Sequence, residues 1–435
     1  MTRLNRRQFL KGSATLAAGF MIVPRHVLGG PGYIAPSDEI TLGIIGCGRQ
    51  SGGLGKQFGK LADCRIIAAC DVDATKLERF VKRDKENQKS YARVRGDGKS
   101  SEVQGYRDFR EMLNRDDLDA IIVATPDHWH AVISIMGMKA GKDVYCEKPL
   151  AQSVKEGRAM VDAAHLYERV VQTGSMQRSW KDFRTACELV RNGYLGEIKE
   201  VIVNVGGGPP KPYDLPKQNP GRDIDWDMWC GPSPLLNYNH DLAPPIPEKF
   251  WPKWRYYAET GGGMIGDWGA HMFDIAQWGL GMDHSGPVSL TPTGTTDKPE
   301  MTMKYANGIT MIQKDFGRGN AVRFIGSEGS LDVSRKFLES DINGLVRDAD
   351  KLEMETRLYK SDNHYADFIQ AIKNRSKPIC DVETGHRTSS LCNIVNIAYA
   401  VNKAVMWDPV KEKFSGSGKA NKLRSRKLRG DWKLS

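Results

Sequence analysis

Residues 40–53 read ITLGIIGCGRQSGG, an apolar run that leads directly into a glycine-rich turn. The run has the character of a buried strand. Glycines after such a strand let the backbone approach a pyrophosphate, and the next helix N-terminus offers N–H groups to the phosphates. Ser51 takes the third position of the usual GxGxxG spacing, with Gly52 after it. The turn predicts a dinucleotide site formed by Gly46, Cys47, Gly48, Arg49 and Gln50.

A second strand-like run, residues 64–70, ends at Asp71. Asp71 stands 23 residues after Gly48, where an acidic side chain binds the ribose hydroxyls of NAD. A carboxylate at this place repels the 2′-phosphate of NADP, so the expected cofactor is NAD. The alternative is that Asp71 caps the helix beginning at Ala74, a role that Asp73 fits better.

The alternation of strands and helices then continues along the chain. Residues 118–125 read as a strand, Pro126 opens a helix, and residues 143–146 read as the next strand. Such repetition implies right-handed crossovers and a parallel sheet. We therefore predict an α/β protein whose N-terminal part is a doubly wound Rossmann domain.

The most specific motif, Glu147-Lys148-Pro149, follows that third strand. With the glycine-rich turn, Asp71 and Ala124-Thr125-Pro126, it resembles the Gfo/Idh/MocA family (glucose–fructose oxidoreductase and inositol dehydrogenase) over residues 38–405. The resemblance implies that Lys148 lies beside the nicotinamide and transfers protons. The alternative for Lys148 is a surface lysine paired with Glu147. The resemblance extends the predicted cofactor site to Ala124, Thr125, Pro126, His130, Glu147 and Lys148.

The remainder of the chain predicts a C-terminal α/β domain with a large, mainly antiparallel open sheet, which residues 196–205 begin. Asn307-Gly308, between two alternating runs, predicts a type I′ hairpin turn. An apolar helix over residues 388–405 should pack back on the nucleotide domain.

An aromatic, proline-rich stretch spans residues 209–257. Aromatic rings of this kind stack on the apolar faces of sugars, fill a core, or lie in an oligomer interface. The sequence leaves these three roles open. Trp254 and Tyr256 are the predicted substrate contacts from this stretch.

A second motif, GGGMIGDWGAHMFD, occupies residues 261–274. Asp267 and His271 are four residues apart, which places them on one helix face. A carboxylate beside an imidazole raises its basicity and fixes its tautomer. The pair resembles the family's D-x-x-x-H motif, which implies that Asp267 orients the substrate and His271 shares acid–base work with Lys148. The alternative is a helix-capping aspartate and a buried histidine with satisfied hydrogen bonds.

Two further residues are predicted to bind substrate. Asp274 adjoins the face that carries His271, and Arg178 follows the expected last strand of the Rossmann domain. The alternative for Arg178 is an interdomain ion pair.

The N-terminal residues resemble a twin-arginine signal peptide, because NRRQFLK at residues 5–11 precedes a mildly apolar run. That run is too short to span a bilayer, so no stable membrane insertion is expected after signal removal. The predicted organisation has four parts: a signal at 1–35, the NAD domain at 36–176, the substrate and oligomerisation domain at 177–405, and a basic tail at 406–435. The expected location is the periplasm.

Composition narrows the list of partners. The net charge is +10, yet aromatic side chains are not interleaved with the basic residues of the tail as in a nucleic-acid platform. We therefore expect a solvated tail and no nucleic acid. The eight cysteines include no CxxC pair, which predicts small buried hydrophobes, no disulfide framework and no metal site. The expected assembly is a homodimer or homotetramer formed through the C-terminal sheet.

These observations predict an NAD(H)-dependent oxidoreductase that acts on a secondary hydroxyl of a sugar, glycoside or polyol. An exported enzyme has no free NAD pool, so the cofactor should be tightly bound. One alternative is a glycosidase that uses NAD transiently, through oxidation, elimination and return of the hydride. The other is a non-catalytic sugar-binding or assembly protein on a dehydrogenase scaffold.

Overall fold

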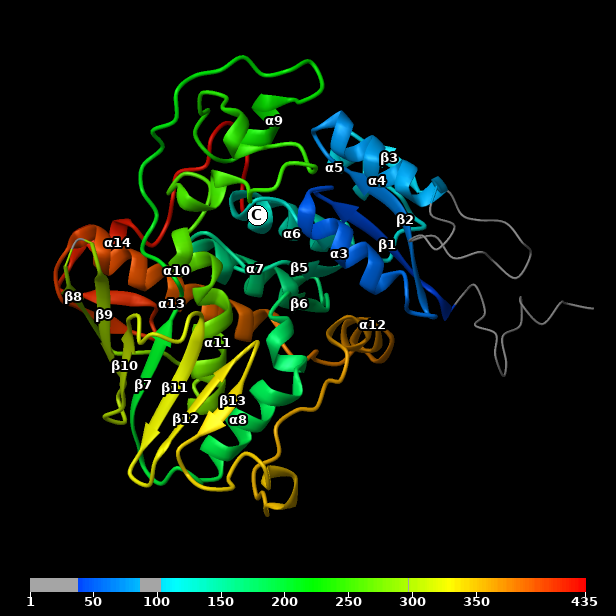
Figure 1. Cartoon of the computed structure of the whole chain (residues 1–435). Helices are drawn as coiled ribbons and strands as arrows, with labels where there is room; N and C mark the ends of the chain where they lie inside the picture. The colour runs from blue at the N-terminus through cyan, green and yellow to red at the C-terminus, as the bar shows by residue number, and fades with distance from the viewer. Residues whose placement is uncertain (1–37, 87–102, 296) are drawn as a thin grey trace, which may run out of the picture.

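The computed structural model describes residues 38–86, 103–295 and 297–435. The predicted signal at 1–35 lies outside the described residues. The chain forms two sheets side by side, the smaller at the N-terminal end of the chain and the larger beyond it (Figure 1). None of the described helices is long and apolar enough to cross a membrane. All eight cysteines are free and buried, as predicted.

The first sheet is the predicted Rossmann sheet. Its six strands are all parallel in the order β3-β2-β1-β4-β5-β6. Strands covered by helices on both faces become continuously apolar, which explains runs such as AIIV in β4. The bounds are β1 Ile40–Ile45, β2 Cys64–Cys70, β3 Gln104–Tyr106, β4 Ala120–Val123, β5 Asp143–Cys146 and β6 Val171–Thr173.

The helices of this domain follow the predicted alternation. Asp73 accepts a hydrogen bond from the Lys76 amide at 3.1 Å and so caps the second helix, which leaves Asp71 free for another role. That helix runs to Glu86. The bounds are α3 Arg49–Phe58, α4 Ala74–Glu86, α5 Phe109–Leu113, η2 Asp127–Trp129, α6 His130–Lys139 and α7 Val154–Leu166.

The second sheet has nine strands in the order β13-β12-β11-β7-β10-β9-β8-β14-β15. Only β7 and β10 pair in parallel, so the sheet is mainly antiparallel, as predicted. The bounds are β7 Ile198–Asn204, β8 Ser289–Gly294, β9 Pro299–Lys304, β10 Thr310–Gln313, β11 Ala321–Gly326, β12 Ser330–Ser334, β13 Leu338–Ser340, β14 Val405–Asp408 and β15 Lys413–Ser415.

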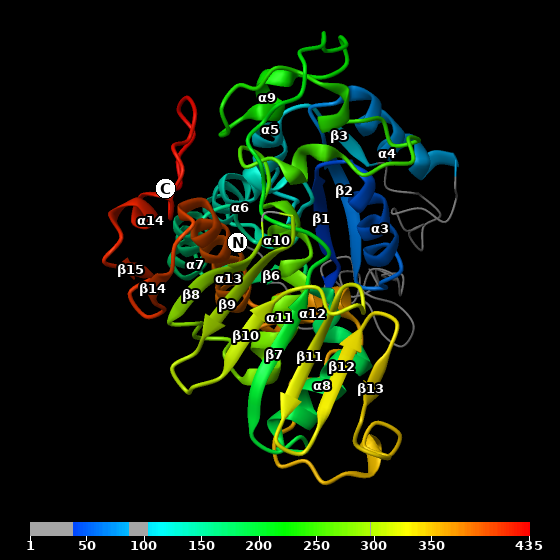
Figure 2. The same ribbon diagram turned by 60° about the vertical axis from the view of Figure 1, so that its left-hand side comes forward.

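One face of this sheet packs on helices and forms the main core (Figure 2). Helix α13 also contacts α7 and β6, so the prediction that it packs back on the nucleotide domain is confirmed, although it begins earlier than predicted. The covering and connecting helices are η3 Met176–Ser179, α8 Lys181–Arg191, α9 Trp226–Cys230, η4 His240–Leu242, η5 Lys253–Tyr256, α10 Gly263–Asp267, α11 Gly269–Leu280, η6 Ala349–Lys351, α12 His364–Asn374, α13 Val382–Val401 and α14 Gly418–Lys422.

The β9–β10 hairpin has a different turn from the predicted type I′. Gly308 has a φ of 88°, but Asn307 does not have a positive φ, which type I′ requires at both central residues. The Gly308 amide donates to the Tyr305 carbonyl at 3.1 Å, and Tyr305 donates to Ile309 at 2.9 Å. This is a type I turn followed by a left-handed glycine.

The C-terminal residues are not a solvated tail, which corrects the prediction for 406–435. Strands β14 and β15 extend the large sheet at the β8 edge. Beyond α14, Arg426 forms an ion pair with Glu156 on α7 at 2.6 Å and donates to the His128 carbonyl at 2.6 Å. Trp432 then stacks on Phe109 with ring centroids 6.1 Å apart. The basic residues of the tail are therefore partners for groups of the nucleotide domain that the sequence order does not reveal.

Replacing Arg426 with methionine should lower the free energy of unfolding by about 3 kcal/mol, because it leaves a buried charge without its counter-charge. The Glu156 side chain is only 2% exposed and would lose its guanidinium partner. Equilibrium urea unfolding measures this. Lys427→Met is the matched control, since its side chain is exposed and next in sequence. Equal stability of the two variants would contradict the role assigned to Arg426.

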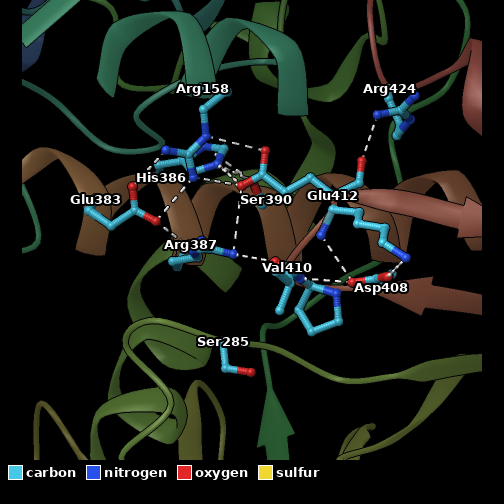
Figure 3. Close-up of polar contacts among 12 residues, drawn as sticks. Arg158, Ser285, Glu383, His386, Arg387, Ser390, Asp408, Val410, Glu412 and Arg424 are labelled. Atoms are coloured by element: carbon cyan, nitrogen blue, oxygen red, sulfur yellow. Dashed lines mark hydrogen bonds and ion pairs between the residues drawn. The ribbon is translucent and has the colours of Figure 1, made fainter. Parts of the chain in front are cut away.

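An ion-pair network fastens the same C-terminal segment to α13 and α7 (Figure 3). Arg158 on α7 donates to Glu383 at 2.8 Å and to Glu412 at 2.7 Å, and His386 contacts Glu412 at 2.7 Å. Burial opposes ionisation of both glutamates. Hydrogen bonds from Arg158 and Arg387 to Glu383, and from His386 and Arg158 to Glu412, outweigh it and lower the pKa of each carboxyl to about 2.

This network should make the protein sensitive to acid. Because both pKa values lie below the ordinary 4.5, the carboxylates stabilise the fold fully above about pH 4.5, and that contribution is lost as the pH falls toward 2. Glu412→Gln should therefore destabilise the protein at pH 7. The difference in stability between pH 7 and pH 3 should be smaller in this variant than in the wild type. Thermal unfolding at the two pH values measures this, with Glu353→Gln, an exposed site, as the control. An unchanged pH dependence in Glu412→Gln would contradict it.

Candidate active site

A cavity of about 420 Å³ lies between the two domains, at the carboxyl ends of the Rossmann strands. Ligands of doubly wound sheets bind at this edge, where the strand order reverses between β1 and β4. All of the cofactor residues predicted from the sequence line the cavity except Cys47. Its walls also include the aromatic stretch and the start of α10 and α11.

The glycine-rich turn shapes the floor of the cavity. Gly46 has a φ of 92°, and a Cβ there would stand 2.7 Å from the Ala124 backbone, so only glycine fits. A Cβ at Gly48 would meet no protein atom within 4 Å, which leaves open space above this residue. Arg49 Nη2 and Thr125 Oγ1 are buried and have no hydrogen-bond partner. These free donors beside open space fit a dinucleotide pyrophosphate.

Asp71 lies at one end of this floor. Its Oδ2 accepts from the Cys47 amide at 2.6 Å and its Oδ1 accepts from the Asp73 amide at 2.8 Å. Cys47 is itself buried and does not line the cavity, so it acts by holding Asp71. Burial raises the pKa of Asp71. The carboxylate is therefore fixed at the position that the sequence assigned to a ribose-binding group.

A long segment, residues 205–262, roofs this end of the cavity. The Asp225 amide donates to the Val72 carbonyl at 3.0 Å, and the Ala74 amide donates to Asp223 at 2.8 Å. Lys76 Nζ reaches the Ala243 carbonyl at 3.1 Å. The roof is thus tied to the residues that follow Asp71, and a nucleotide below it would be enclosed.

Part of the aromatic stretch fills a core, which was one of its three predicted roles, and part lines the cavity. Trp229 and Tyr257 are buried in a small core of the roof. Trp251, Trp254 and Tyr256 line the cavity, as predicted for Trp254 and Tyr256. Trp251 lies between two guanidinium groups, with Arg49 5.9 Å and Arg255 5.1 Å from its ring centroid.

Lys148 lies at the centre of the cavity, after β5. Its Nζ donates to Asp267 Oδ1 at 2.5 Å and to the Asp267 carbonyl at 3.1 Å. Glu147 instead accepts from Gln50 Nε2 at 3.0 Å. The alternative of a surface lysine paired with Glu147 is therefore excluded, because Lys148 is mostly buried and joins the two domains. His130 supports the turn, since its ring nitrogens contact the Pro149 carbonyl at 2.8 Å and the Thr125 carbonyl at 3.0 Å.

Asp267 and His271 both line the cavity, but they are not a hydrogen-bonded pair. Asp267 ends α10 and His271 belongs to α11, so the prediction of one shared helix is wrong. Burial, with the charges of Lys148 and Arg335, lowers the pKa of His271 well below its ordinary value. The expected rise in basicity is therefore also wrong. Its Nδ1 is buried without a hydrogen-bond partner, so a neutral imidazole remains available to a ligand.

The carboxylate of Asp267 is ionised. Burial opposes this, but Lys148 and Arg255 together lower its pKa. Arg255 Nε lies 3.4 Å from Asp267 Oδ2, opposite the oxygen that Lys148 binds. Asp267 therefore fixes both cations in the cavity wall.

Arg178 and Asp274 do not reach the cavity, so their prediction as substrate contacts is wrong. Arg178 is 2% exposed, and its guanidinium pairs with Asp274 at 2.8 Å and with Asp283 at 2.7 Å. Asp274 also accepts from Thr388 at 2.9 Å. An ion pair was the alternative for Arg178, and the structure places it inside the C-terminal domain rather than between the domains.

Among the wall residues that sequence reasoning missed are Asp127, Arg255 and Arg335. Asp127 follows the Ala124-Thr125-Pro126 motif directly, which was the available signal. Burial raises its pKa to about 8, so it is protonated at neutral pH. Arg255 lies in the aromatic stretch between Trp254 and Tyr256, which were the predicted contacts there. Arg335 follows a strand in an otherwise unremarkable turn and carried no sequence signal.

The described residues hold no group of three or more metal-ligating side chains that could bind an ion. The cavity offers a lysine, a neutral histidine and carboxyl groups beside a floor that fits a dinucleotide. Asp71, Arg49, Thr125 and the turn at Gly46 and Gly48 are the residues that would hold such a dinucleotide.

Comparison with protein-family models gives two matches that cover most of the chain. Residues 40–175 match the Gfo/Idh/MocA oxidoreductase model for the NAD-binding Rossmann fold. Residues 190–434 match the C-terminal alpha/beta domain of the same oxidoreductase family.

The curated relatives are matched only in part. A glycosyl hydrolase family 109 protein of Shewanella pealeana is 31% identical over 211 residues, which cover 45% of this chain and 44% of that protein. A second family 109 protein, from Shewanella sp. strain ANA-3, is 31% identical over 46% of this chain and 45% of its own length. The chain thus matches less than half of the length of these relatives.

Solved structures share the whole fold at low identity. The WlbA dehydrogenase of Bordetella pertussis, in complex with NADH and UDP-GlcNAcA, has a TM-score of 0.61 and 18% identity over 85% of this chain and 98% of its own. An aldose–aldose oxidoreductase of Caulobacter crescentus, complexed with glycerol, has a TM-score of 0.58 and 18% identity. The match covers 85% of this chain and 99% of that protein.

Proposed function

Because the chain belongs to the Gfo/Idh/MocA oxidoreductase family, we propose that it oxidises or reduces a secondary hydroxyl carbon of a sugar, glycoside or polyol with NAD. The observation that carries the proposal is the meeting of Lys148, Asp267 and His271 in the cavity that the glycine-rich turn floors. When bound, NAD supplies the hydride chemistry. Sugar-binding dehydrogenases among the solved neighbours support this substrate class.

The protein residues supply orientation and proton transfer. The neutral His271 imidazole, with its free Nδ1, is able to accept the hydroxyl proton of a bound sugar. Lys148 Nζ donates hydrogen bonds and stabilises negative charge on the substrate oxygen. Asp267 holds that ammonium in place, while Trp254 and Tyr256 offer apolar ring faces to the sugar.

The same proposal includes a cofactor that stays bound between turnovers. The roof formed by residues 205–262 is hydrogen-bonded to Val72 and Ala74 and covers the ribose end of the site. Release of the dinucleotide would require these bonds to open. A bound cofactor suits export through a twin-arginine route, which carries folded proteins, and periplasmic action without an NAD pool. Residues 5–11 support that location.

Two steps test the proposal. The purified protein is denatured and the released nucleotide is identified; we expect NAD in near-stoichiometric amount. The native protein is then mixed with a panel of sugars, polyols and glycosides while nicotinamide absorbance is followed. The absorbance of reduced nicotinamide should increase with at least one of these compounds. A protein that carries no nucleotide and takes up none would refute the proposal and favour a non-catalytic binding role.

A second candidate is hydrolysis of a glycosidic bond through transient oxidation, which the family 109 relatives favour. Oxidation would acidify a neighbouring C–H, elimination would break the glycosidic bond, and the hydride would return. Release of the aglycone without lasting reduction of the nicotinamide would identify it. Lasting reduction with a free sugar would identify net oxidoreduction instead.

We also propose a homodimer or homotetramer formed through the nine-stranded sheet. The support is that its helices α8, α11 and α13 gather on one side, whereas the strands face the viewer uncovered in Figure 2. Analytical ultracentrifugation checks the mass. Substitution of Ile312 on this sheet by aspartate should favour the monomer.

A further inference from the structure

The substrate end of the cavity carries more positive than negative charge. Lys148 and Arg255 lie on the two oxygens of Asp267, and Arg335 also acts on this carboxylate through space. Asp127 does not offset them, because it is protonated at neutral pH. His271 is uncharged there. Three cations, Lys148, Arg255 and Arg335, therefore lie around the carboxylate of Asp267 at this end of the wall, and Glu147 acts on Arg335 only at longer range.

Arg335 is the cation that remains without an acidic partner. Among the described residues, no carboxylate lies within 4.0 Å of its guanidinium, and Asp267 and Glu147 act on it only at longer range. The other two cations are already engaged by Asp267. The charge of Arg335 is therefore available at the cavity wall.

The position of Arg335 is nonetheless fixed. Its guanidinium carbon lies 4.5 Å from the ring centroid of Trp268 and 5.6 Å from that of Trp180. Its Nε donates to Gln177 Oε1 at 2.9 Å. Stacking on planar rings and a bonded Nε leave the terminal nitrogens as the donors of a preorganised fork.

We propose that the substrate is a sugar acid, whose carboxylate is bound by Arg335 in the wall of the cavity. This inference rests on the proposed function and names its substrate class. A planar carboxylate accepts two parallel hydrogen bonds from the guanidinium fork and brings one negative charge. A phosphate also accepts a bidentate pair from the fork, so the experiment compares the two anions directly.

The test uses the nucleotide-loaded protein and matched probes. The probes are D-glucuronate and D-galacturonate, their methyl esters, D-glucose and D-galactose, and the corresponding 6-phosphates. Binding is measured by isothermal titration and turnover by nicotinamide absorbance. Arg335→Gln removes the charge, and Arg335→Lys keeps it without the fork. The control is Arg318→Gln, because Arg318 stacks on Phe337 and pairs with Glu339 outside the cavity.

At least one uronate should bind about 100-fold more tightly than its methyl ester and its neutral sugar. Arg335→Gln should remove that preference, Arg335→Lys should restore part of it, and Arg318→Gln should keep it in full. The inference is wrong if no uronate is preferred over its ester, if a 6-phosphate is preferred over both uronates, or if Arg335→Gln retains the preference.

The two readouts separate this inference from the proposed function. Uronate binding that depends on Arg335 but gives no turnover would support the sugar-acid site and contradict the oxidoreductase proposal. Turnover of neutral sugars with no preference for uronates would support the oxidoreductase proposal and contradict the sugar-acid site.

Discussion

Lys148→Met should lower turnover by about 10³-fold while the protein stays folded and keeps its NAD, because the pyrophosphate and ribose of the nucleotide are assigned to other residues and Arg255 still pairs with Asp267. Lys148 Nζ is the only group of the nucleotide domain for which the described residues show a direct hydrogen bond to the Asp267 side chain. Methionine conserves the length of the side chain but neither donates a hydrogen bond nor stabilises a developing alkoxide. Nicotinamide absorbance under single-turnover conditions measures the rate.

Two variants control this prediction. Lys139→Met changes a lysine at the exposed end of α6 and should leave the rate unchanged. Lys148→Arg keeps a charge for Asp267 with a bulkier head group, and should preserve the fold but recover little of the rate. Wild-type turnover in Lys148→Met would remove the lysine from the chemistry.

Gly48→Ala should weaken NAD binding by about 100-fold, close to 3 kcal/mol, without unfolding the protein. Gly48 has a φ of −73°, which alanine adopts freely, and a Cβ there meets no protein atom within 4 Å. The new methyl group would instead occupy the space through which a pyrophosphate approaches the backbone. The amount of nucleotide that remains after purification measures the loss.

Gly53→Ala is the matched control for this variant. Gly53 lies on the exposed face of α3, where a Cβ also has open space, so alanine should keep the nucleotide and slightly stabilise the helix. If Gly48→Ala also keeps its full complement of NAD, the dinucleotide does not lie over this turn.

The sequence predicted what depends on local pattern. The apolar strand that ends at Gly46, the strand that ends at Asp71 and the Glu147-Lys148-Pro149 motif are each recognised within a few consecutive residues. All three contribute to the cavity. The resemblance to a known family added Asp267 and His271, which lie far along the chain from Lys148. The parallel sheet brings the first three motifs together because the carboxyl ends of its strands share one edge, whereas Asp267 and His271 reach the cavity from α10 and α11 of the C-terminal domain.

What the sequence missed depends on partners that are distant in the chain. Arg178 was predicted to bind substrate because it follows a Rossmann strand, but Asp274 and Asp283 occupy its guanidinium. The charges of the C-terminal tail suggested solvation, whereas Arg426 meets a buried Glu156. In each case the sequence shows the charge and only the fold supplies its counter-charge.

The same reasoning applies to His271. Its spacing from Asp267 predicted a carboxylate–imidazole pair, but a helix boundary falls between them and Lys148 takes the carboxylate. The result is a neutral, buried imidazole with a lowered pKa. This changes its expected role from a strong base held by aspartate to an uncharged acceptor beside a fixed ammonium.

The most direct measurement is a crystal structure of the protein purified with its nucleotide. The account predicts the nicotinamide ring in the cavity, in contact with both the Lys148 ammonium and the His271 imidazole, and the pyrophosphate over Gly48. A dinucleotide whose ring lies away from these two side chains would contradict the assignment of the site, whatever activity the protein shows.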